Sequence, residues 1–445
     1  MSNLRYNQQG MTIIEVLVAL AIFSITMVGI YSLFNLATRV TSDTRARVDA
    51  TAIANQRLEM VRNLRYDDVG TEGGVPSGTI PRTEEIVRNR ISYTVTTDVM
   101  YIDDPFDGLA GEVPDDLFNS DYKRVRVEVA WPRALNDSPV IFISDIAPKG
   151  IESDITGGTL NLTVFDALGN IVPTADVHLE NTDVVPVINL DTQTTVTGKL
   201  ILPGMTPSVE TYDIVVTKAG YSTDQTHETD PVNNPNPNPP PISIFDGIVT
   251  EHSFTIDQLS ALTIQTRNLD ESAIGNIDFS LRGSKTIGTD GAEQPIYKYQ
   301  LAHATDATGV ITLNDMEWDT YTLSIDGALS GYDIAGANLP LPINLLPGSN
   351  QTLDIYVAPH TDHSLLVTAR GESGALIENA SVHVTNAAPL YDATQTTTSY
   401  GQTFFSNLAN STYTVEVTAA GYEVYAQDIP IDGWTSAELF LTESP

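Results

Sequence analysis

Residues 11–34 read Met11-Thr-Ile-Ile-Glu15-Val-Leu-Val-Ala-Leu-Ala-Ile-Phe-Ser-Ile-Thr-Met-Val-Gly-Ile-Tyr-Ser-Leu-Phe34, and Glu15 is the only charged residue among them. The stretch is long enough to cross a membrane as a helix, which needs about 20 mostly apolar residues. A charged side chain at the centre of the hydrocarbon layer costs roughly 2.5–3.5 kcal/mol. We therefore expect Glu15 either to have a cationic partner or to extend its carboxylate to the membrane surface.

The residues before this stretch form a short polar leader that ends in Gly10. An ordinary secretory signal peptide is cut after its apolar core. Here the glycine precedes the apolar core, so cleavage after Gly10 would leave the helix on the mature protein. The sequence Gly10-Met11-Thr-Ile-Ile-Glu15, followed by an apolar run, resembles the class III leader of type IV pilins and type II secretion pseudopilins.

This resemblance implies processing and assembly roles for three residues. A membrane prepilin peptidase would cut after Gly10, and Met11 would become the N-methylated amino terminus. The cationic amino terminus of a neighbouring subunit would then meet the charge of Glu15 in the filament. The chain departs from the family pattern in having Met where Phe is more frequent as the first mature residue. No proline precedes Pro76, so the helix kink common in major pilins is not expected.

The helix is predicted to continue beyond the membrane, because no Pro or Gly occurs between Ala37 and Tyr66. Apolar residues recur there at roughly helical spacing, with Arg and Asp between them. They are Ala37, Val40, Val48, Ala52, Leu58, Val61 and Leu64. A helix from Thr12 to about Tyr66 would be ~80 Å long, and its amphipathic second half needs a globular cover.

Residues 67–150 have the pattern of that cover. Several glycines and Pro76, all between residues 70 and 78, break the helix. Residues 91–99 and 125–131 alternate apolar and polar side chains, which predicts antiparallel strands with one buried face. A long helix covered by a small antiparallel sheet is the pilin pattern. Residues 125–131 also resemble the last core strand of minor pilins and pseudopilins.

The rest of the chain repeats one pattern about every hundred residues, which predicts three domains at 158–257, 258–358 and 359–445. Each repeat has an opening strand, a second strand, a Tyr-led strand, a Gly-Tyr pair and a closing strand. The Tyr-led strands are 212–216, 321–325 and 413–417, and the Gly-Tyr pairs begin at Gly220, Gly331 and Gly421. Short strands with regular turn signals favour β-sandwiches. The pattern resembles the seven-stranded carboxypeptidase-regulatory-like (transthyretin-like) family.

The Pro/Asn-rich run at residues 230–241 is predicted to be an extended loop or semi-rigid spacer, inside the first sandwich or between the first two. Proline lacks the N–H group that a β-ladder needs, so we expect no sheet in this run. The predicted fold class is therefore α+β followed by all-β. It has a leader (1–10), a long helix (11–66), a small antiparallel sheet (67–150) and three tandem sandwiches.

The chain has 445 residues, no cysteine and a formal charge of −35. The lack of cysteine excludes disulfides, thiolate metal sites and cysteine nucleophiles. Residues 1–65 carry seven arginines and four acidic residues, a balance of +3, so the remainder carries −38. An acidic surface repels nucleic acid, so DNA binding is not favoured, and a solvated outer surface is the simpler interpretation.

Clustered carboxylates near residue 110 form a candidate Ca²⁺ site. They are Asp103, Asp104, Asp107, Asp115, Asp116 and Asp121. Carboxylates in a loop with Gly and Pro are the oxygen ligands that Ca²⁺ prefers, although the spacing does not match an EF-hand. The alternative is a solvated loop that binds no ion.

Other chemistry finds little support. No nucleotide-binding, metalloprotease or hydrolase motif occurs, so we expect neither an enzyme nor a cofactor. His360 and His363 are a close histidine pair, but no further zinc ligand is apparent. Lys–Asn isopeptide crosslinks occur in some adhesin sandwiches. Only four lysines follow residue 157, however, and the last repeat has none.

These observations predict a minor pilin or pseudopilin-like subunit of a type IV pilus or type II secretion filament. It would begin as a single-pass protein of the inner (cytoplasmic) membrane and be processed after Gly10. Its sandwiches would then stand at the cell surface as a tip, a spacer or an adhesive head for an unidentified protein or glycan. Its partners would be prepilin peptidase, the membrane and other pilin subunits.

Two alternatives remain at this point. The first is an uncleaved, membrane-anchored surface stalk or adhesin outside any filament. The second is a secreted hydrolase with accessory sandwiches. It would need a catalytic domain, which residues 70–150 do not indicate.

Overall fold

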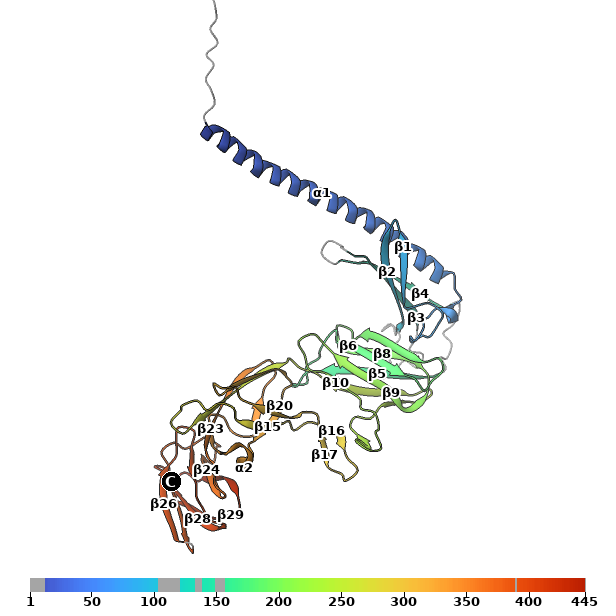
Figure 1. Cartoon of the computed structure of the whole chain (residues 1–445). Coiled ribbons are helices and arrows are strands. Elements are labelled where there is room, and N and C mark those ends of the chain that lie inside the picture. Colours follow the sequence, from blue (N-terminus) through green and yellow to red (C-terminus); the bar gives the residue numbers. More distant parts are fainter. Residues whose placement is uncertain (1–12, 103–120, 133–137, 149–156, 389, 445) are drawn as a thin grey trace, which may run out of the picture.

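A long helix leads into a series of β-structures in the computed structural model (Figure 1). The structure describes residues 13–102, 121–132, 138–148, 157–388 and 390–444. The helix runs into a small sheet, and the β-sandwiches follow one another from that sheet to the carboxyl terminus at the far end. This order of a helix with a small sheet and then all-β structure confirms the predicted fold class.

Helix α1 (Ile13–Arg62) has 50 residues and is about 75 Å long. It continues through Gly29 without a break. The predicted end near Tyr66 was a few residues too late. The last turn tightens when Leu64 N donates to Val61 O, and a separate 3-10 helix, η1 (Tyr66–Asp68), follows.

The second half of α1 covers a four-stranded antiparallel sheet in the order β1-β2-β3-β4. We call it the pilin-like sheet, with strands β1 (Thr83–Arg88), β2 (Ile91–Ile102), β3 (Tyr122–Ala130) and β4 (Val140–Ile146). The alternation predicted for residues 91–99 and 125–131 is confirmed. In β2 and β3 every second side chain is buried against α1.

The buried stripe of α1 differs in part from the predicted one. It consists of Ala46, Ala50, Ile53, Ala54, Leu58 and Val61. Leu58 and Val61 were predicted correctly, but Val40 and Val48 are exposed. Alanines form half of the stripe, and their small side chains let the sheet approach the helix backbone. The prediction gave weight to the larger valines, and it therefore placed the buried stripe partly on the wrong side of the helix.

Sandwich 1 packs two sheets around one apolar core. One sheet has the order β13-β5-β8, and the other has the order β10-β9-β6-β7 with β12 also paired to β9. Its strands are β5 (Gly158–Phe165), β6 (Asp176–Asn181), β7 (Ile188–Gln193), β8 (Lys199–Met205), β9 (Ser208–Thr217), β10 (Asp224–Gln225), β12 (Ile242–Ile244) and β13 (Val249–Thr255).

Sandwich 2 has the sheets β19-β14-β23-β21 and β18-β15-β20-β22. Its elements are β14 (Ser260–Asn268), β15 (Asp278–Arg282), β18 (Gln300–Ala304), β19 (Val310–Met316), β20 (Asp319–Ser324), α2 (Gly327–Ser330), β21 (Tyr332–Ala337), β22 (Ile343–Leu345) and β23 (Asn350–Pro359).

Sandwich 3 has the sheets β27-β24-β30 and β26-β25-β28-β29. Its strands are β24 (Ser364–Gly371), β25 (Ser381–Ala387), β26 (Leu390–Thr396), β27 (Gln402–Phe405), β28 (Ser411–Thr418), β29 (Tyr425–Ile431) and β30 (Trp434–Leu441). Within the described residues it has the predicted seven strands, whereas sandwiches 1 and 2 each have one more.

The three sandwiches share their internal contacts as well as their strand order. The first strand pairs in parallel with the last in each: β5 with β13, β14 with β23, and β24 with β30. The tyrosines of the Tyr-led strands, Tyr212, Tyr321 and Tyr413, are buried. Each hydroxyl hydrogen-bonds to the backbone a few residues upstream, as in the tyrosine corners of other sandwiches. These tyrosines are therefore part of the packing of each sandwich.

The Pro/Asn-rich run corrects one prediction, because part of it does join a sheet. Strand β11 (Asn236–Pro237) pairs with β16 (Thr286–Thr289), which pairs in turn with β17 (Pro295–Tyr297). The pairing avoids the missing N–H of proline, since the adjacent Asn238 N donates to Ile287 O at 3.0 Å. The loop of sandwich 1 thereby forms a β-contact with sandwich 2.

Candidate assembly site

The predicted processing residues lie at the start of the chain. Gly10 and Met11 are outside the described residues, and Glu15 lies in the first turn of α1. Their roles in cleavage, methylation and assembly therefore stay predictions.

The first half of α1 has an uncovered apolar surface. The large apolar side chains that the structure describes between Ile13 and Leu36 are 51% to 82% exposed. Figure 1 shows this part of the helix standing clear of all β-structure. By length and composition the helix is apolar enough to cross a membrane. Such a surface is unfavourable in water and needs lipid or other helices around it.

The polar side chains on this half do not contradict an apolar environment. Ser24 Oγ donates to Leu20 O at 2.8 Å, and Ser32 Oγ donates to Val28 O at 2.9 Å. Thr26, Asn35 and Thr38 make the same kind of bond to carbonyls one turn earlier. These bonds satisfy the polar groups within the helix, so they need no water.

Lys123 ties the end of α1 to the pilin-like sheet, and the sequence analysis missed it. Its side chain is buried, and its Nζ donates to Tyr66 O at 2.8 Å and Val69 O at 2.7 Å. The ammonium also lies over the rings of Tyr66 and Tyr101. Burial lowers the pKa of Lys123 to about 8, although Asp67 and Asp68 act in the opposite direction. Its place among the inward residues of an alternating strand was the available signal.

The first joint connects the pilin-like sheet to sandwich 1. Val75, in the loop before β1, is buried in the core of sandwich 1. Next to it, Asn189 N on β7 donates to Gly73 O at 2.8 Å. Arg82 completes the joint, because its guanidinium lies 3.0 Å from the Asp191 carboxylate and also donates to the Asp191 carbonyl. An apolar plug and a cation thus fix sandwich 1 to the sheet.

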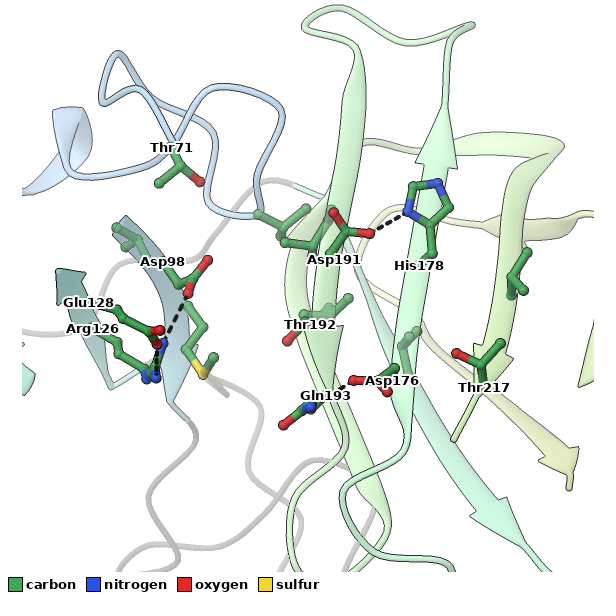
Figure 2. Close-up of a pocket in the computed structure, with 17 residues that line it drawn as sticks. Thr71, Asp98, Arg126, Glu128, Asp176, His178, Asp191, Thr192, Gln193 and Thr217 are labelled. Carbon is green, nitrogen blue, oxygen red and sulfur yellow. Dashed lines mark hydrogen bonds and ion pairs between the residues drawn. The ribbon is translucent and has the colours of Figure 1, made fainter. Parts of the chain in front are cut away.

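A cleft of about 710 Å³ opens beside this joint, between the outer faces of the two units (Figure 2). Most of its charged side chains pair with one another: His178 Nδ1 lies 2.6 Å from Asp191, and Arg126 pairs with Asp98 and Glu128. Asp176 accepts a hydrogen bond from Gln193. The hydrogen bond from His178 and the positive charge of Arg82 hold the pKa of Asp191 below its usual range. Since these groups satisfy each other's charges and hydrogen bonds, we interpret the cleft as part of the joint.

The second joint connects sandwiches 1 and 2. Besides the β11–β16 pairing, Lys298 Nζ of sandwich 2 donates to Thr223 O of sandwich 1 at 2.6 Å. Lys298 and Lys285 both pair with Glu317, at 2.8 and 2.7 Å. The two lysines therefore form ion pairs, and Lys218 donates to Pro173 O. These contacts give no support to the isopeptide hypothesis.

The third joint is built around the buried carboxylate of Asp333, between sandwiches 2 and 3. It accepts hydrogen bonds from Ser364 Oγ at 3.0 Å and Thr361 N at 3.2 Å, and His360 Nδ1 lies 2.7 Å away. Across the same joint, Trp434 Nε1 donates to Ile334 O at 2.7 Å. His360 is thus part of a joint, and no zinc site with His363 is supported.

The candidate Ca²⁺ site falls largely outside the described residues. Asp103, Asp104, Asp107, Asp115 and Asp116 lie there, and Asp121 directly precedes β3, where its N donates to Ile102 O at 3.1 Å. Within the described ranges, no three His, Asp or Glu side chains are grouped to hold a metal ion. The Ca²⁺ site stays a prediction.

Comparison with known families identifies one motif. The prokaryotic N-terminal methylation motif matches residues 5–31. This match contains Gly10, Met11 and Glu15 and covers the first part of α1. No curated protein matches the chain.

Three solved structures illustrate a distant likeness. The Bacillus anthracis TIE protein is 13% identical, with 82% of this chain and 74% of that chain covered and a TM-score of 0.19. The shaft pilin SpaA from Lactobacillus rhamnosus GG is 12% identical, with 42% and 99% covered and a TM-score of 0.18. BcpA, the major pilin subunit of Bacillus cereus, is 9% identical, with 65% and 100% covered and a TM-score of 0.17. Values this low carry no argument about function.

The class of protein follows from the amino-terminal motif and the structure it precedes. A methylation motif, an uncovered apolar helix and a small sheet packed on the second half of that helix define a pilin-like surface subunit. Such a motif implies processing by a prepilin peptidase, membrane anchoring and assembly with other pilins.

Proposed function

We propose that this chain is a minor pilin or pseudopilin-like subunit of a type IV pilus or type II secretion filament. The observation that carries the proposal is the uncovered first half of α1 directly after the methylation motif. Cleavage after Gly10 would free the amino group of Met11. That cation would then pair with the carboxylate of Glu15 on a neighbouring subunit. A carboxylate in apolar surroundings needs such a partner.

The arm of sandwiches favours a low-copy position at the tip. Three sandwiches follow the pilin-like sheet, and each joint has specific polar contacts. A rod of this size on every subunit would crowd a repeating shaft, whereas one copy at a tip meets no such limit. We retain the domain division at residues 67–150, 158–257, 258–358 and 359–445 as part of this proposal.

Adhesion to a surface protein or glycan is the function we propose for the outer end. Sandwich 3 is the unit farthest from α1 (Figure 1). The net charge of −38 beyond residue 65 makes nucleic acid an unfavourable ligand. The uncleaved surface stalk remains the competing function, because it would use the same helix and the same arm.

The two functions differ at the amino terminus, so the first experiment is its mass in protein from native membranes and filaments. We expect a terminus at N-methyl-Met11 and the chain in the filament fraction. Glu15→Ala should leave cleavage intact and remove the chain from filaments. Ser24→Ala is the matched control, since it changes a side chain of the same helix that bonds only within α1.

An intact Met1 terminus with normal surface display of Glu15→Ala would overturn the filament proposal and favour the anchored stalk. A terminus at Met11 with Glu15→Ala still in filaments would keep the processing but remove the assembly role of Glu15.

A further inference from the structure

Basic side chains are concentrated where α1 meets the pilin-like sheet. Arg39, Arg45, Arg47, Arg88 and Arg90 all lie at this end of the sheet. Among the described residues, the acidic ones there are Asp43, Asp49 and Glu85, and Glu85 accepts hydrogen bonds from Ser92 and Thr94. Asp43 accepts a hydrogen bond from Trp131 Nε1, and Asp49 pairs with Asn89 and Arg88. This end is thus cationic in a chain whose remainder is strongly acidic.

A notch of about 870 Å³ lies between the helix and the first hairpin of the sheet. Arg39 and Asp43 line it from α1, and Arg90 and Trp131 line it from the sheet. Arg47 takes part in neighbouring contacts, since it lies over the Trp131 ring and donates to Ser138 O. Among the residues that the structure describes, Arg39 and Arg90 have no ion-pair partner. Two exposed guanidiniums therefore face a space that can hold an anion.

Arg90 occupies a position that suits another residue better. Asn89 and Arg90 form the two-residue turn between β1 and β2, and their φ angles are 50° and 66°. A turn with two positive φ angles favours Asn followed by Gly, because glycine has no Cβ to oppose this conformation. The chain thus accepts a backbone cost at the position that supplies a cation to the notch.

The rise of the helix places the notch at the surface of a membrane. If the apolar stretch that ends at Phe34 fills the hydrocarbon layer, Arg39 lies about 7.5 Å beyond it. A headgroup layer is roughly 5–8 Å thick on each side of a bilayer. Arginine side chains also extend toward that layer while their stems stay on apolar surface. Arg39 is therefore at the depth of lipid phosphates, and Arg90 faces the same notch.

We propose that this notch binds the headgroup phosphate of an anionic phospholipid while the subunit is in the membrane. The contact would hold the pilin-like sheet upright on the outer surface of the membrane before assembly. The inference needs only that α1 crosses the membrane, which the filament subunit and the uncleaved stalk share. Its failure would therefore leave the proposed filament function untouched.

The test is binding of short-chain phosphatidylglycerol to the full chain in neutral detergent, with phosphatidylcholine of the same length and inorganic phosphate as comparison ligands. We expect saturable, salt-sensitive binding of phosphatidylglycerol alone. Arg39→Gln and Arg90→Gly should each weaken it about fivefold, the effect of one cation near an anionic surface. Arg65→Gln is the matched control, because Arg65 lies after the carboxyl end of α1, away from the notch, where it is exposed and pairs with Asp67.

Arg90→Gly makes the test independent of folding, since glycine suits the backbone of that turn and should not destabilise the protein. Equal binding of phosphatidylcholine, equal binding of inorganic phosphate, or unchanged binding by Arg90→Gly would each overturn the proposal. Hydrogen exchange of residues 88–92 gives a second measurement. Slower exchange in phosphatidylglycerol bilayers than in phosphatidylcholine bilayers would support a lipid. Slower exchange only in filaments would replace the lipid by an acidic surface of a neighbouring subunit.

Discussion

The carboxylate of Asp191 on β7 lies 3.0 Å from the guanidinium of Arg82, which precedes β1 and also pairs with Asp98. This contact joins two units that share no sheet. The plug of Val75 and the backbone bond from Asn189 to Gly73 lie beside it. In this joint the Arg82–Asp191 contact sets the orientation of the two units, and Val75 supplies apolar burial. The two contributions can be tested separately.

We expect Arg82→Gln to loosen the joint with little loss of overall stability, because its partner Asp191 is exposed and an ion pair with solvent contributes only about 0–1 kcal/mol. The chain has no cysteine, so spin labels placed by Val87→Cys and Val209→Cys report a single distance. Both sites are exposed, one on the pilin-like sheet and one on sandwich 1. The distance distribution should broaden in Arg82→Gln and stay narrow in the control Arg65→Gln. Equal widths in all variants would show that Arg82 does not orient the joint.

We expect Val75→Ala to lower the free energy of unfolding of sandwich 1 by about 2 kcal/mol, because the side chain is buried in that core. Hydrogen exchange in β5 and β8 should accelerate accordingly, while exchange in β2 and β3 stays the same. Val87→Ala is the control, since its side chain is exposed and its loss should change stability by less than about 0.5 kcal/mol. Faster exchange in the pilin-like sheet alone would contradict this assignment of Val75.

The lowered pKa of Lys123 predicts a pH dependence of the pilin-like sheet. Its pKa is about 8 in the folded chain and 10.5 in the unfolded one, so the unfolded state binds more protons between these values. The free energy of unfolding should therefore rise with pH from 8 toward 9.5, and Lys123→Met should remove the rise. Hydrogen exchange in β3 measures it, with Lys218→Met as the control. A fall in stability over this range would mean that contacts with the ammonium outweigh its desolvation.

The third joint should weaken as the pH rises above neutrality. The hydrogen bond to Asp333 raises the pKa of His360, and Asp362 and Asp326 act in the same direction. The stabilisation is thus fully present below the unfolded pKa of about 6.5 and is lost as the pH rises through the folded pKa. Protection factors in β21, which are corrected for the intrinsic pH dependence of exchange, should be lower at pH 8 than at pH 6, and His360→Gln should flatten the difference. His363→Gln should keep it; if it flattens the difference as well, the effect does not belong to His360.

The sequence predicted the strands of the sandwiches well because their alternation is local. The strand expected at residues 212–216 lies within β9, and the one expected at 413–417 lies within β28. In a strand, residues two positions apart occupy the same face, so the sequence itself shows which side chains lie on the buried face.

Contacts between distant segments were not predictable in the same way. Arg82 and Asp191 are exposed-looking charges with more than a hundred residues between them, and no periodicity links them. The run at 230–241 was expected to form no ladder, since proline argues against one locally. The strand that pairs with this run, β16, belongs to the next domain. The sequence pattern alone shows neither partner.

The parallel pairing of the first and last strands has a mechanical consequence. Because the two strands run in the same direction, the chain enters each sandwich at one end of the pair and leaves at the other. Tension between the membrane and the tip then loads these pairs lengthwise. The seven residue pairs of β5 with β13, and the eight in each of the other two sandwiches, must slide together and cannot open one at a time. In a tether built from such units, all residue pairs of a strand pair resist a stretching force together.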